Sequence, residues 1–371
     1  MKKVNGHEII QLFEQFSPKG LAMEGDKIGL QIGRLNQKVE RVMIALDVIE
    51  EVVDEAIEKQ VQLIIAHHPP IYRPLQKLAT ETAQGRIIEK LIKHDIAVYA
   101  AHTNLDVAEG GVNDLLAEAL GIQNAEVLVP TYETALKKLV VFVPNSHAEQ
   151  VRQALGNTGA GFIGNYSHCS FSTEGNGRFL PEEGTNPYIG KTGNLETVAE
   201  VRIETIVPEP LLKKAITAML KSHPYEEVAY DVYPLEQKGA LLGLGRIGTV
   251  EEMTLGEFAE RVKTALEVEQ IRVVGNLTAK IRKVAVLGGD GNKYYSQAKF
   301  KGADVYVTGD IYYHTAHDAM MLGLHMIDPG HNVEKVMKKG VANVLAKMCI
   351  EAGYEVEIFP SEPNTDPFQF T

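Results

Sequence analysis

Apolar runs that end in polar segments recur through the first third of the chain. The run VMIALD at 42–47 predicts a buried strand, and the apolar positions from 49 to 57 recur on one face of a helix. Asp47 stands between the two and is predicted to cap that helix. The alternation continues with predicted strands and helices in turn at 61–69, 85–94, 96–106 and 113–121. This β-α-β-α-β-α order favours a parallel sheet covered by helices.

The last third repeats this pattern. Apolar runs break into polar or glycine-rich loops at 283–292, 303–314 and 324–331, with helical stretches between them. A long helix is expected from about His331 to Glu351, followed by a strand at 354–360. Both ends of the chain therefore predict α/β structure.

The middle of the chain has a different pattern. Predicted strands at 137–144, 197–208 and 226–235 accompany predicted helices at 145–156 and 209–223, with a glycine-rich stretch between the first helix and the second strand. The order is that of a ferredoxin-like α+β unit. We therefore expect a discontinuous three-layer α/β/α domain, residues 1–130 and 241–371, with residues 131–240 inserted into it.

Length, charge and cysteine content limit the kinds of partner and metal site that the protein can have. A length of 371 residues exceeds what one hydrophobic core usually organises, and the net charge of -12 argues against nucleic acid as a partner. No apolar run suggests a signal peptide or a membrane span, so no membrane partner and a cytoplasmic location are expected. The two cysteines, Cys169 and Cys349, have no metal-binding spacing. Any metal would be held by His, Asp and Glu.

Histidine, aspartate and glutamate residues that could bind a metal ion stand where predicted strands end. The candidates are four imidazoles and two carboxylates: His67, His68, His102, Asp106, His331 and Glu334. Ligands of open parallel sheets gather at the carboxyl ends of the strands, so these side chains would converge on one rim. His67 and His68 can point the same way only if the strand has ended, and the two prolines that follow enforce that end.

The donor set predicts divalent metal ions. Imidazole and carboxylate suit zinc, which we expect first, and also manganese or iron. Six ligands exceed what one catalytic ion normally uses, so two ions that share a carboxylate are expected. Simpler roles stay open at this point. His331 could be a neighbour of a helix N-cap, Glu334 a first-turn acid and Asp106 a turn-forming residue.

Other candidate sites are less specific. His314 and His317 follow a predicted strand that ends at Gly309-Asp310, and His314 is predicted as a catalytic acid or base or as a substrate contact. The turn LGGDGN at 287–292 could present backbone N–H groups to an anion, but it lacks P-loop spacing.

Several motifs together resemble one family. AHHPPIY, AHTNLDVAEGGVND, VAVLGGDGN, YVTGDIYYH, DPGHNVEK and the closing NTDPF look like blocks of the Nif-three-like (NGG-interacting-factor-three) proteins, whose members often carry the name GTP cyclohydrolase I type 2. One block departs from the family. EGDKIGLQIG at 24–33 keeps Asp26 and the glycines of a Trp-Asp-Asn-type block, and the protein contains no tryptophan.

The resemblance implies a dinuclear metal centre in a toroidal homohexamer whose metal pockets face an internal cavity. It places the six candidate residues at ligand positions, with His102 either a direct ligand or a pocket residue. In the hydrolase hypothesis below, His102 is also a candidate for moving protons. The middle segment is similar to the PII-like and CutA-like insertion of longer members, which shorter members lack.

Two functions follow as hypotheses. The first is a metal-dependent hydrolase in which activated water attacks a small molecule such as a nucleotide, as in GTP cyclohydrolase I type 2 or a phosphoesterase. The second is a non-enzymatic, hexameric metal-binding or small-molecule-sensing protein with a regulatory insertion.

Overall fold

A computed structural model describes residues 3–371, and the chain folds into two compact units. Unit 1 contains the described residues up to Tyr132 together with Leu242–Thr371, and unit 2 is Glu133–Leu241. Two long strands, β7 (Gln123–Pro144) and β10 (Tyr230–Thr254), each cross the boundary between the units.

The first sheet of unit 1 combines the three strands expected in the first third of the chain with the strand expected at 354–360 and one strand that the sequence did not predict. Its order is β15 (Glu357–Pro360), β4 (Arg41–Ala45), β5 (Leu63–Ala66), β6 (Ala97–Ala100) and β2 (Gly29–Ile32). The first four strands are parallel, and β2 is antiparallel to β6. Every residue of β5 and β6 is buried, which explains why these strands are continuous apolar runs rather than alternating ones.

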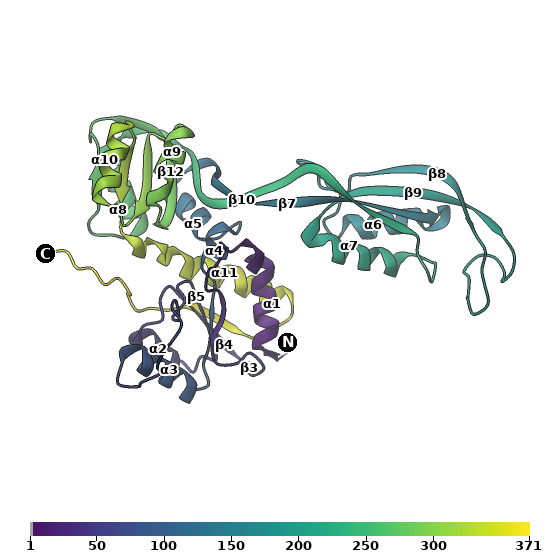
Figure 1. Cartoon of the computed structure of the whole chain (residues 1–371), viewed down its shortest axis with the longest axis horizontal. Helices are drawn as coiled ribbons and strands as arrows, with labels where there is room; N and C mark the ends of the chain where they lie inside the picture. The colour runs from purple at the N-terminus through teal and green to yellow at the C-terminus, as the bar shows by residue number, and fades with distance from the viewer. Residues whose placement is uncertain (1–2) are drawn as a thin grey trace. The chain divides into compact units, whose positions relative to one another are not determined.

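The second sheet of unit 1 contains the strands of the last third (Figure 1). Its order is β11 (Arg272–Val274), β14 (His325–Asp328), β13 (Val305–Gly309), β12 (Lys280–Asp290) and β10. The three central strands are parallel, and the outer two are antiparallel to them. A further pair joins β1 (Val4–Asn5) to β3 (Lys38–Val39).

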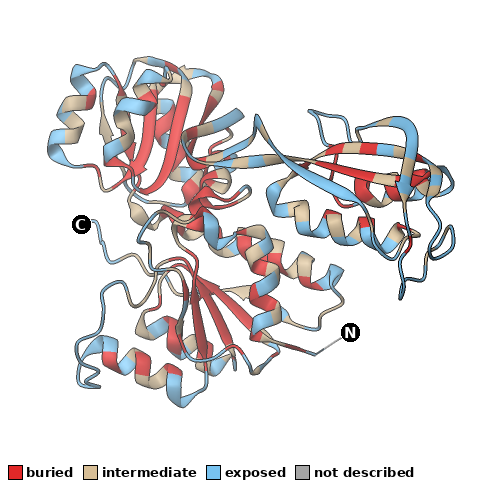
Figure 2. Ribbon diagram, turned by 45° about the vertical axis from the view of Figure 1, so that its right-hand side comes forward, coloured by how far each residue is buried: buried red, intermediate tan, exposed pale blue. Residues whose placement is uncertain are grey.

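Helices cover both faces of each sheet. The core shared by the two sheets includes side chains from α1 (Gly6–Phe16), α5 (Val112–Ala119), α8 (Leu255–Leu266) and α11 (Val336–Glu351). The outer face of the first sheet packs on α2 (Glu50–Glu58) and α3 (Ala83–Lys93), and that of the second packs on α9 (Tyr295–Phe300) and α10 (Tyr313–Met321). Figure 2 shows the buried strands within these helical layers. The α/β class predicted from the sequence is confirmed.

Local sequence explains where several helices begin. Asn5 and Glu8 form a capping box at the start of α1, and Thr254 and Glu257 form one at the start of α8. Thr82 caps α3 through the N–H of Gly85. Within residues 3–371, no helix has both the length and the apolar character needed to cross a membrane.

Two local predictions need correction. Asp47 does not cap α2, because this helix begins at Glu50 with Ile49 as the N-cap residue. The helix expected from His331 begins as the 3₁₀ segment η4 (His331–Lys335), and α11 follows it. The 3₁₀ form has three residues per turn, so it aligns the side chains of His331 and Glu334 more closely than an α-helix would.

Unit 2 forms one sheet with helices on one face. Its elements are β7, the short η2 (Asn145–His147), α6 (Ala148–Gly156), β8 (Ser170–Phe179), β9 (Glu196–Pro208), α7 (Glu209–Ser222) and the first part of β10. The strand order is β10-β7-β9-β8, with β9 antiparallel to both β7 and β8. Apolar residues of β7 and β9 pack against α6 and α7.

The shared core of unit 1 should depend strongly on Phe258 of α8, which is fully buried. Phe258→Ala is expected to lower the free energy of unfolding by about 3–5 kcal/mol, because truncation removes buried contacts and leaves a cavity. Phe300→Ala is the matched control, since that ring is 92% exposed, and should change stability by less than about 0.5 kcal/mol. Urea unfolding followed by circular dichroism measures both. Equal losses in the two variants would contradict this assignment of the core.

Candidate metal centre

His67 and His68 follow directly on the carboxyl end of β5. The strand ends at Ala66, but the backbone stays fixed because the N–H groups of both histidines donate to carbonyls at the end of β4. The two rings lie 5.0 Å apart and are inclined at 44°. They can therefore face a common point, which adjacent residues of a regular strand cannot do.

His102 and Asp106 follow the next strand, β6. His102 precedes the short helix α4 (Thr103–Val107), and Asp106 lies in this helix with only 8% of its surface exposed. The rings of His67 and His102 have their centroids 5.2 Å apart. The ends of β5 and β6 thus bring together three imidazoles and one buried carboxylate.

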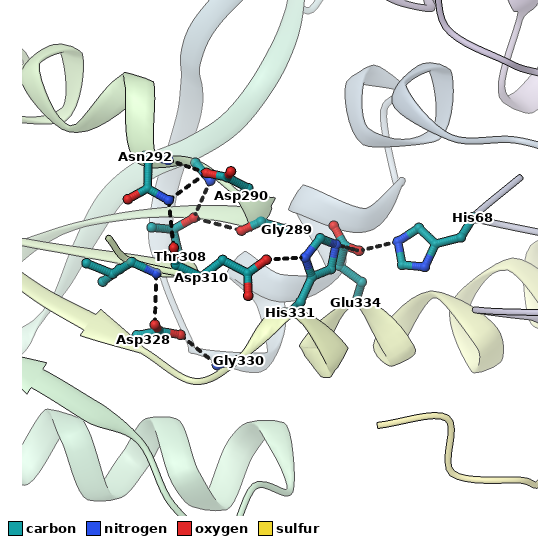
Figure 3. Close-up of polar contacts among 12 residues, drawn as sticks. His68, Gly289, Asp290, Asn292, Thr308, Asp310, Asp328, Gly330, His331 and Glu334 are labelled. Atoms are coloured by element: carbon teal, nitrogen blue, oxygen red, sulfur yellow. Dashed lines mark hydrogen bonds and ion pairs between the residues drawn. The ribbon is translucent and has the colours of Figure 1, made fainter. Parts of the chain in front are cut away.

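His331 and Glu334 come from the second sheet. The turn Asp328-Pro329-Gly330 links β14 to η4, and the Asp328 carboxylate accepts hydrogen bonds from the N–H groups of Gly330 and Ile311 (Figure 3). Asp328 therefore ties the loop after β13 to the loop after β14. Figure 3 shows Glu334 pointing toward His331 and His68. Glu334 is 3% exposed.

The Glu334 carboxylate lies among three imidazoles. Its Oε2 atom lies 3.0 Å from Nε2 of His68, 3.2 Å from Nε2 of His331 and 3.6 Å from Nε2 of His67. The described residues contain three overlapping groups able to hold a metal ion: His67, His68 and His102; His68, His331 and Glu334; and His67, Asp106 and Glu334. All six candidate ligands from the sequence belong to at least one group.

Each of the four imidazoles is held by an oxygen on the opposite side of its ring. Nδ1 lies 3.0 Å from the Ala101 carbonyl in His67, 2.7 Å from Asp47 Oδ1 in His68, 2.9 Å from Asp26 Oδ1 in His102 and 2.7 Å from Asp310 Oδ2 in His331. In the neutral imidazole, Nδ1–H donates a hydrogen bond to this oxygen, which leaves the lone pair of Nε2 available to a metal ion. This is the usual arrangement around metal-binding histidines.

The three supporting carboxylates were not predicted as partners of histidine from the sequence. Asp47, Asp26 and Asp310 stand in the loops after β4, before β2 and after β13. Asp47 was predicted as a helix cap instead, and Asp310 was noted only as the end of a strand. Their position beside strand ends is a usable signal, but it does not distinguish a partner of histidine from an ordinary loop residue.

Glycine is required where β12 passes the centre. Gly289 has φ +65°, and a Cβ atom there would lie 2.9 Å from Glu334 Oε1 and 3.3 Å from His331 Nε2. The glycine-rich turn therefore makes room for the candidate ligands. Its N–H groups are already engaged, since Gly288 donates to Asn113, Gly291 to Thr308 and Asn292 to Asp290, so the anion site considered from the sequence has no donors at these positions.

The buried donors fit a cation. His67 Nε2 and Asp106 Oδ1 are buried and have no hydrogen-bond partner among the described residues, and they lie 3.7 Å apart. A charge-assisted hydrogen bond would be shorter, at about 2.8 Å. Two ligands of one tetrahedral zinc ion, each about 2.0–2.1 Å from it, would be separated by roughly 3.3–3.5 Å. Because unsatisfied buried polar atoms are costly, a cation between them is the simplest explanation.

Without a metal ion, histidines of this centre bind protons. Burial would lower the pKa of His68, but hydrogen bonds to Asp47 and Glu334 raise it to about 10. The hydrogen bond with Glu334 raises the pKa of His331 to about 9 against the opposing effect of burial. Burial raises the pKa of Asp106 to about 6. Burial would also raise the pKa of Glu334, but the neighbouring imidazoles hold it well below its usual range.

The structure does not bring His314 to this cluster. It lies exposed on α10, where its ring contacts Tyr313 at a centroid distance of 5.4 Å, and it belongs to none of the three groups. Its predicted role in catalysis stays a prediction.

Removing the oxygen behind His68 should weaken metal binding. Asp47→Ala is expected to raise the Kd for zinc by about 10–100-fold, because the imidazole loses the acceptor that fixes its orientation. Thr365 donates to the second oxygen of Asp47, so Thr365→Val should give a smaller increase. Competition with a chromogenic chelator measures both, with the exposed Asp54→Ala as control. A Kd for Asp47→Ala equal to that of the control would show that this contact does not support a ligand.

Metal binding should release protons. At pH 7.5 the raised pKa values of His68 and His331 keep both imidazoles protonated, and a cation must displace those protons to bind Nε2. Calorimetric titration in two buffers of different ionisation enthalpy should therefore give different apparent heats. The difference should shrink as the pH rises toward 10, and identical heats at pH 7.5 would contradict the expectation.

Comparison with known proteins gives the family. A family model described as Duf34/NIF3 (NGG1p interacting factor 3) matches residues 4–367. A Bacillus subtilis protein named GTP cyclohydrolase 1 type 2 homolog is 63% identical over 370 residues, covering 100% of this chain and 99% of that protein. A Listeria innocua protein of the same name is 52% identical over 372 residues, covering 100% of both chains.

Solved structures agree with this match. The crystal structure of a Bacillus cereus protein related to NIF3 has 65% sequence identity and a TM-score of 0.95, with 100% of both chains covered. The Staphylococcus aureus protein SA1388 has 34% identity and a TM-score of 0.75, also over 100% of both chains. The resemblance inferred from the sequence motifs is confirmed, and the chain belongs to the Duf34/NIF3 family.

Proposed function

We propose that this protein is a dinuclear, metal-dependent hydrolase that acts on a nucleotide-type substrate, as the name GTP cyclohydrolase 1 type 2 homolog of its relatives suggests. One observation carries the proposal. Four imidazoles, each anchored at Nδ1 by an oxygen, surround two buried carboxylates at the ends of strands from two sheets. A histidine pair that served only for stability would not need this shared orientation.

Two of the three donor groups suit separate ions. His67, Asp106 and Glu334 would hold one cation, and His68, His331 and Glu334 would hold the other, with Glu334 shared between them. His102 would complete the first group or face the substrate. Zinc is the preferred ion for this set of imidazoles and carboxylates, and manganese and iron are alternatives. Bound divalent cations would supply activated water near neutral pH and would polarise the group under attack.

The chain's own residues would orient the donors and move protons. The Asp26 carboxylate contacts Nδ1 of His102 and so fixes the ring. It also accepts hydrogen bonds from the backbone N–H and the hydroxyl of Thr103. This leaves His102 Nε2 free to take or give a proton at the substrate. We also keep His314 as a proposed acid or base, on the basis of its position after β13.

The substrate proposal rests on the relatives' names. On GTP, one water would add at C8 of the guanine ring and break one C8–N bond to leave a formamide, and a second water would hydrolyse the remaining C8–N bond and release formate. A phosphoesterase acting on a nucleotide or dinucleotide would use the same centre. Fold and family alone do not fix the substrate, so both reactions belong in the test.

Further proposals concern the architecture. We propose that unit 2 is an inserted ferredoxin-like domain of PII-like or CutA-like type, because its β-α-β-β-α-β order is that of such domains. Residues 1–130 and 241–371 would then form the metal domain, and residues 131–240 the insertion. A homohexamer in the cytoplasm, with no nucleic-acid partner, completes the proposal.

An assay of substrate turnover tests the proposal that the protein is a hydrolase. Protein loaded with zinc, manganese or iron is offered GTP and a panel of phosphoesters, alongside the double variant His67→Ala/His68→Ala and the surface control His94→Ala. Activity should require metal, persist in the control and fall at least about 100-fold in the double variant, because that variant removes ligands of both proposed ions. Thermal melting checks that the variants fold. Tight metal binding without turnover of any compound would support a metal-binding or sensing protein instead.

A further inference from the structure

Unit 2 contains a cavity of about 470 Å³ that takes no part in the metal centre. Its walls come from β7, β8, β9, the loop that joins β8 to β9 and the segment after α7, and all the lining residues lie within Glu133–Leu241. A volume of this size is typical of sites for small organic molecules.

A buried carboxylate lies in the wall of this cavity. Glu200 of β9 is 8% exposed, and its Oε1 accepts a hydrogen bond of 2.9 Å from the hydroxyl of Tyr225. Among residues 3–371, no Lys, Arg or His forms an ion pair with Glu200. Space for its other oxygen comes from Gly177 of β8, where a Cβ atom would lie 2.1 Å from Glu200 Oε2. A buried carboxylate without a cation is costly, which suggests that the positive charge comes from a ligand.

Aromatic rings line the same cavity. The ring centroids of Phe179 and Tyr225 lie 5.8 Å apart and those of Tyr188 and Tyr225 lie 6.3 Å apart. Tyr188 is 54% exposed, so much of this side chain is open to solvent. Ring faces beside a carboxylate are the features that attract organic cations, because the negative face of each ring adds to the charge.

His223 fixes Tyr225 without supplying a positive charge. The backbone N–H of Tyr225 donates to His223 Nδ1 at 3.1 Å, and His223 Nε2 donates to the Phe142 carbonyl at 3.0 Å. This pattern requires a neutral imidazole, and burial lowers the pKa of His223 in agreement with it. Burial and Glu200 also raise the pKa of Tyr225, so its hydroxyl keeps the proton that it donates.

The remaining charges in the wall also favour a cation. Glu226 and Glu227 line the cavity on the acidic side and Arg178 on the basic side. Glu226 accepts the backbone N–H of Asn186 and so holds the loop between β8 and β9. The carboxylates of Glu200, Glu226 and Glu227 outnumber the single guanidinium of Arg178, so the wall is negative overall.

We propose that this cavity binds a small organic ammonium ion, with the ammonium group against Glu200 and the apolar body against Phe179, Tyr188 and Tyr225. The site lies within unit 2, and the proposal does not depend on metal binding or on hydrolysis in unit 1. A ligand here would be a protonated primary amine or a quaternary ammonium ion with an alkyl or aryl body.

Two matched pairs of probes test the charge. Choline is compared with its neutral isostere 3,3-dimethylbutan-1-ol, and benzylamine with benzyl alcohol, by titration of the metal-loaded full chain and by saturation-transfer NMR. At least one cation should bind about tenfold more tightly than its neutral partner. Equal affinity within both pairs, or no saturable binding of either cation, would overturn the proposal.

Variants locate the site. Glu200→Gln keeps the size of the side chain and should remove the preference for the cation, whereas Glu204→Gln on the same strand lies outside the cavity wall and should keep it. Tyr188→Leu should weaken binding of the cation more than binding of the neutral probe. If Glu200→Gln does not fold, the probe pairs on the unaltered chain and Tyr188→Leu still decide. Cation preference retained in both folded variants would place the binding elsewhere and refute the assignment.

Discussion

The contact between the Glu334 carboxylate and three imidazoles is the interaction on which the centre of unit 1 depends. His67 and His68 leave the first sheet, whereas His331 and Glu334 leave the second. Without Glu334, the imidazoles of His67, His68 and His331 would lie close together as partly positive side chains. One buried oxygen atom facing all three Nε2 atoms balances that charge and brings the carboxyl ends of the two sheets to a common point.

The layers of the fold make this meeting possible. Both sheets pack against one set of helices, α1, α5, α8 and α11, so the sheets have a common core between them. The parallel strands that precede His67, His102 and His331 end at this centre, and each histidine finds its supporting oxygen in a loop or strand nearby. The rigid scaffold fixes the supporting oxygens, and they in turn fix the rings.

The six candidate ligands could be predicted from the sequence because the apolar runs show where the strands end. The motif His-His-Pro-Pro marks one of these ends clearly. It could not identify Asp26, Asp47 or Asp310 as partners of histidine, because that role depends on which loops lie side by side. Asp47 shows the limit clearly. An aspartate before a helical pattern is a good cap, but the helix begins three residues later and the carboxylate contacts His68 and Thr365 instead. Contacts between residues 318 positions apart leave no local pattern to read.

The separation of the donors along the chain also sets the order of events during synthesis. His68 and Glu334 are 266 residues apart, and at about 5–20 residues per second the ribosome needs roughly 13–53 s to go from one to the other. During that interval the nascent polypeptide exposes the histidines of the first sheet without their carboxylate. Binding of a cation by all six candidate donors would therefore require the segment that carries His331 and Glu334, and a truncated product without it would keep only the group of His67, His68 and His102.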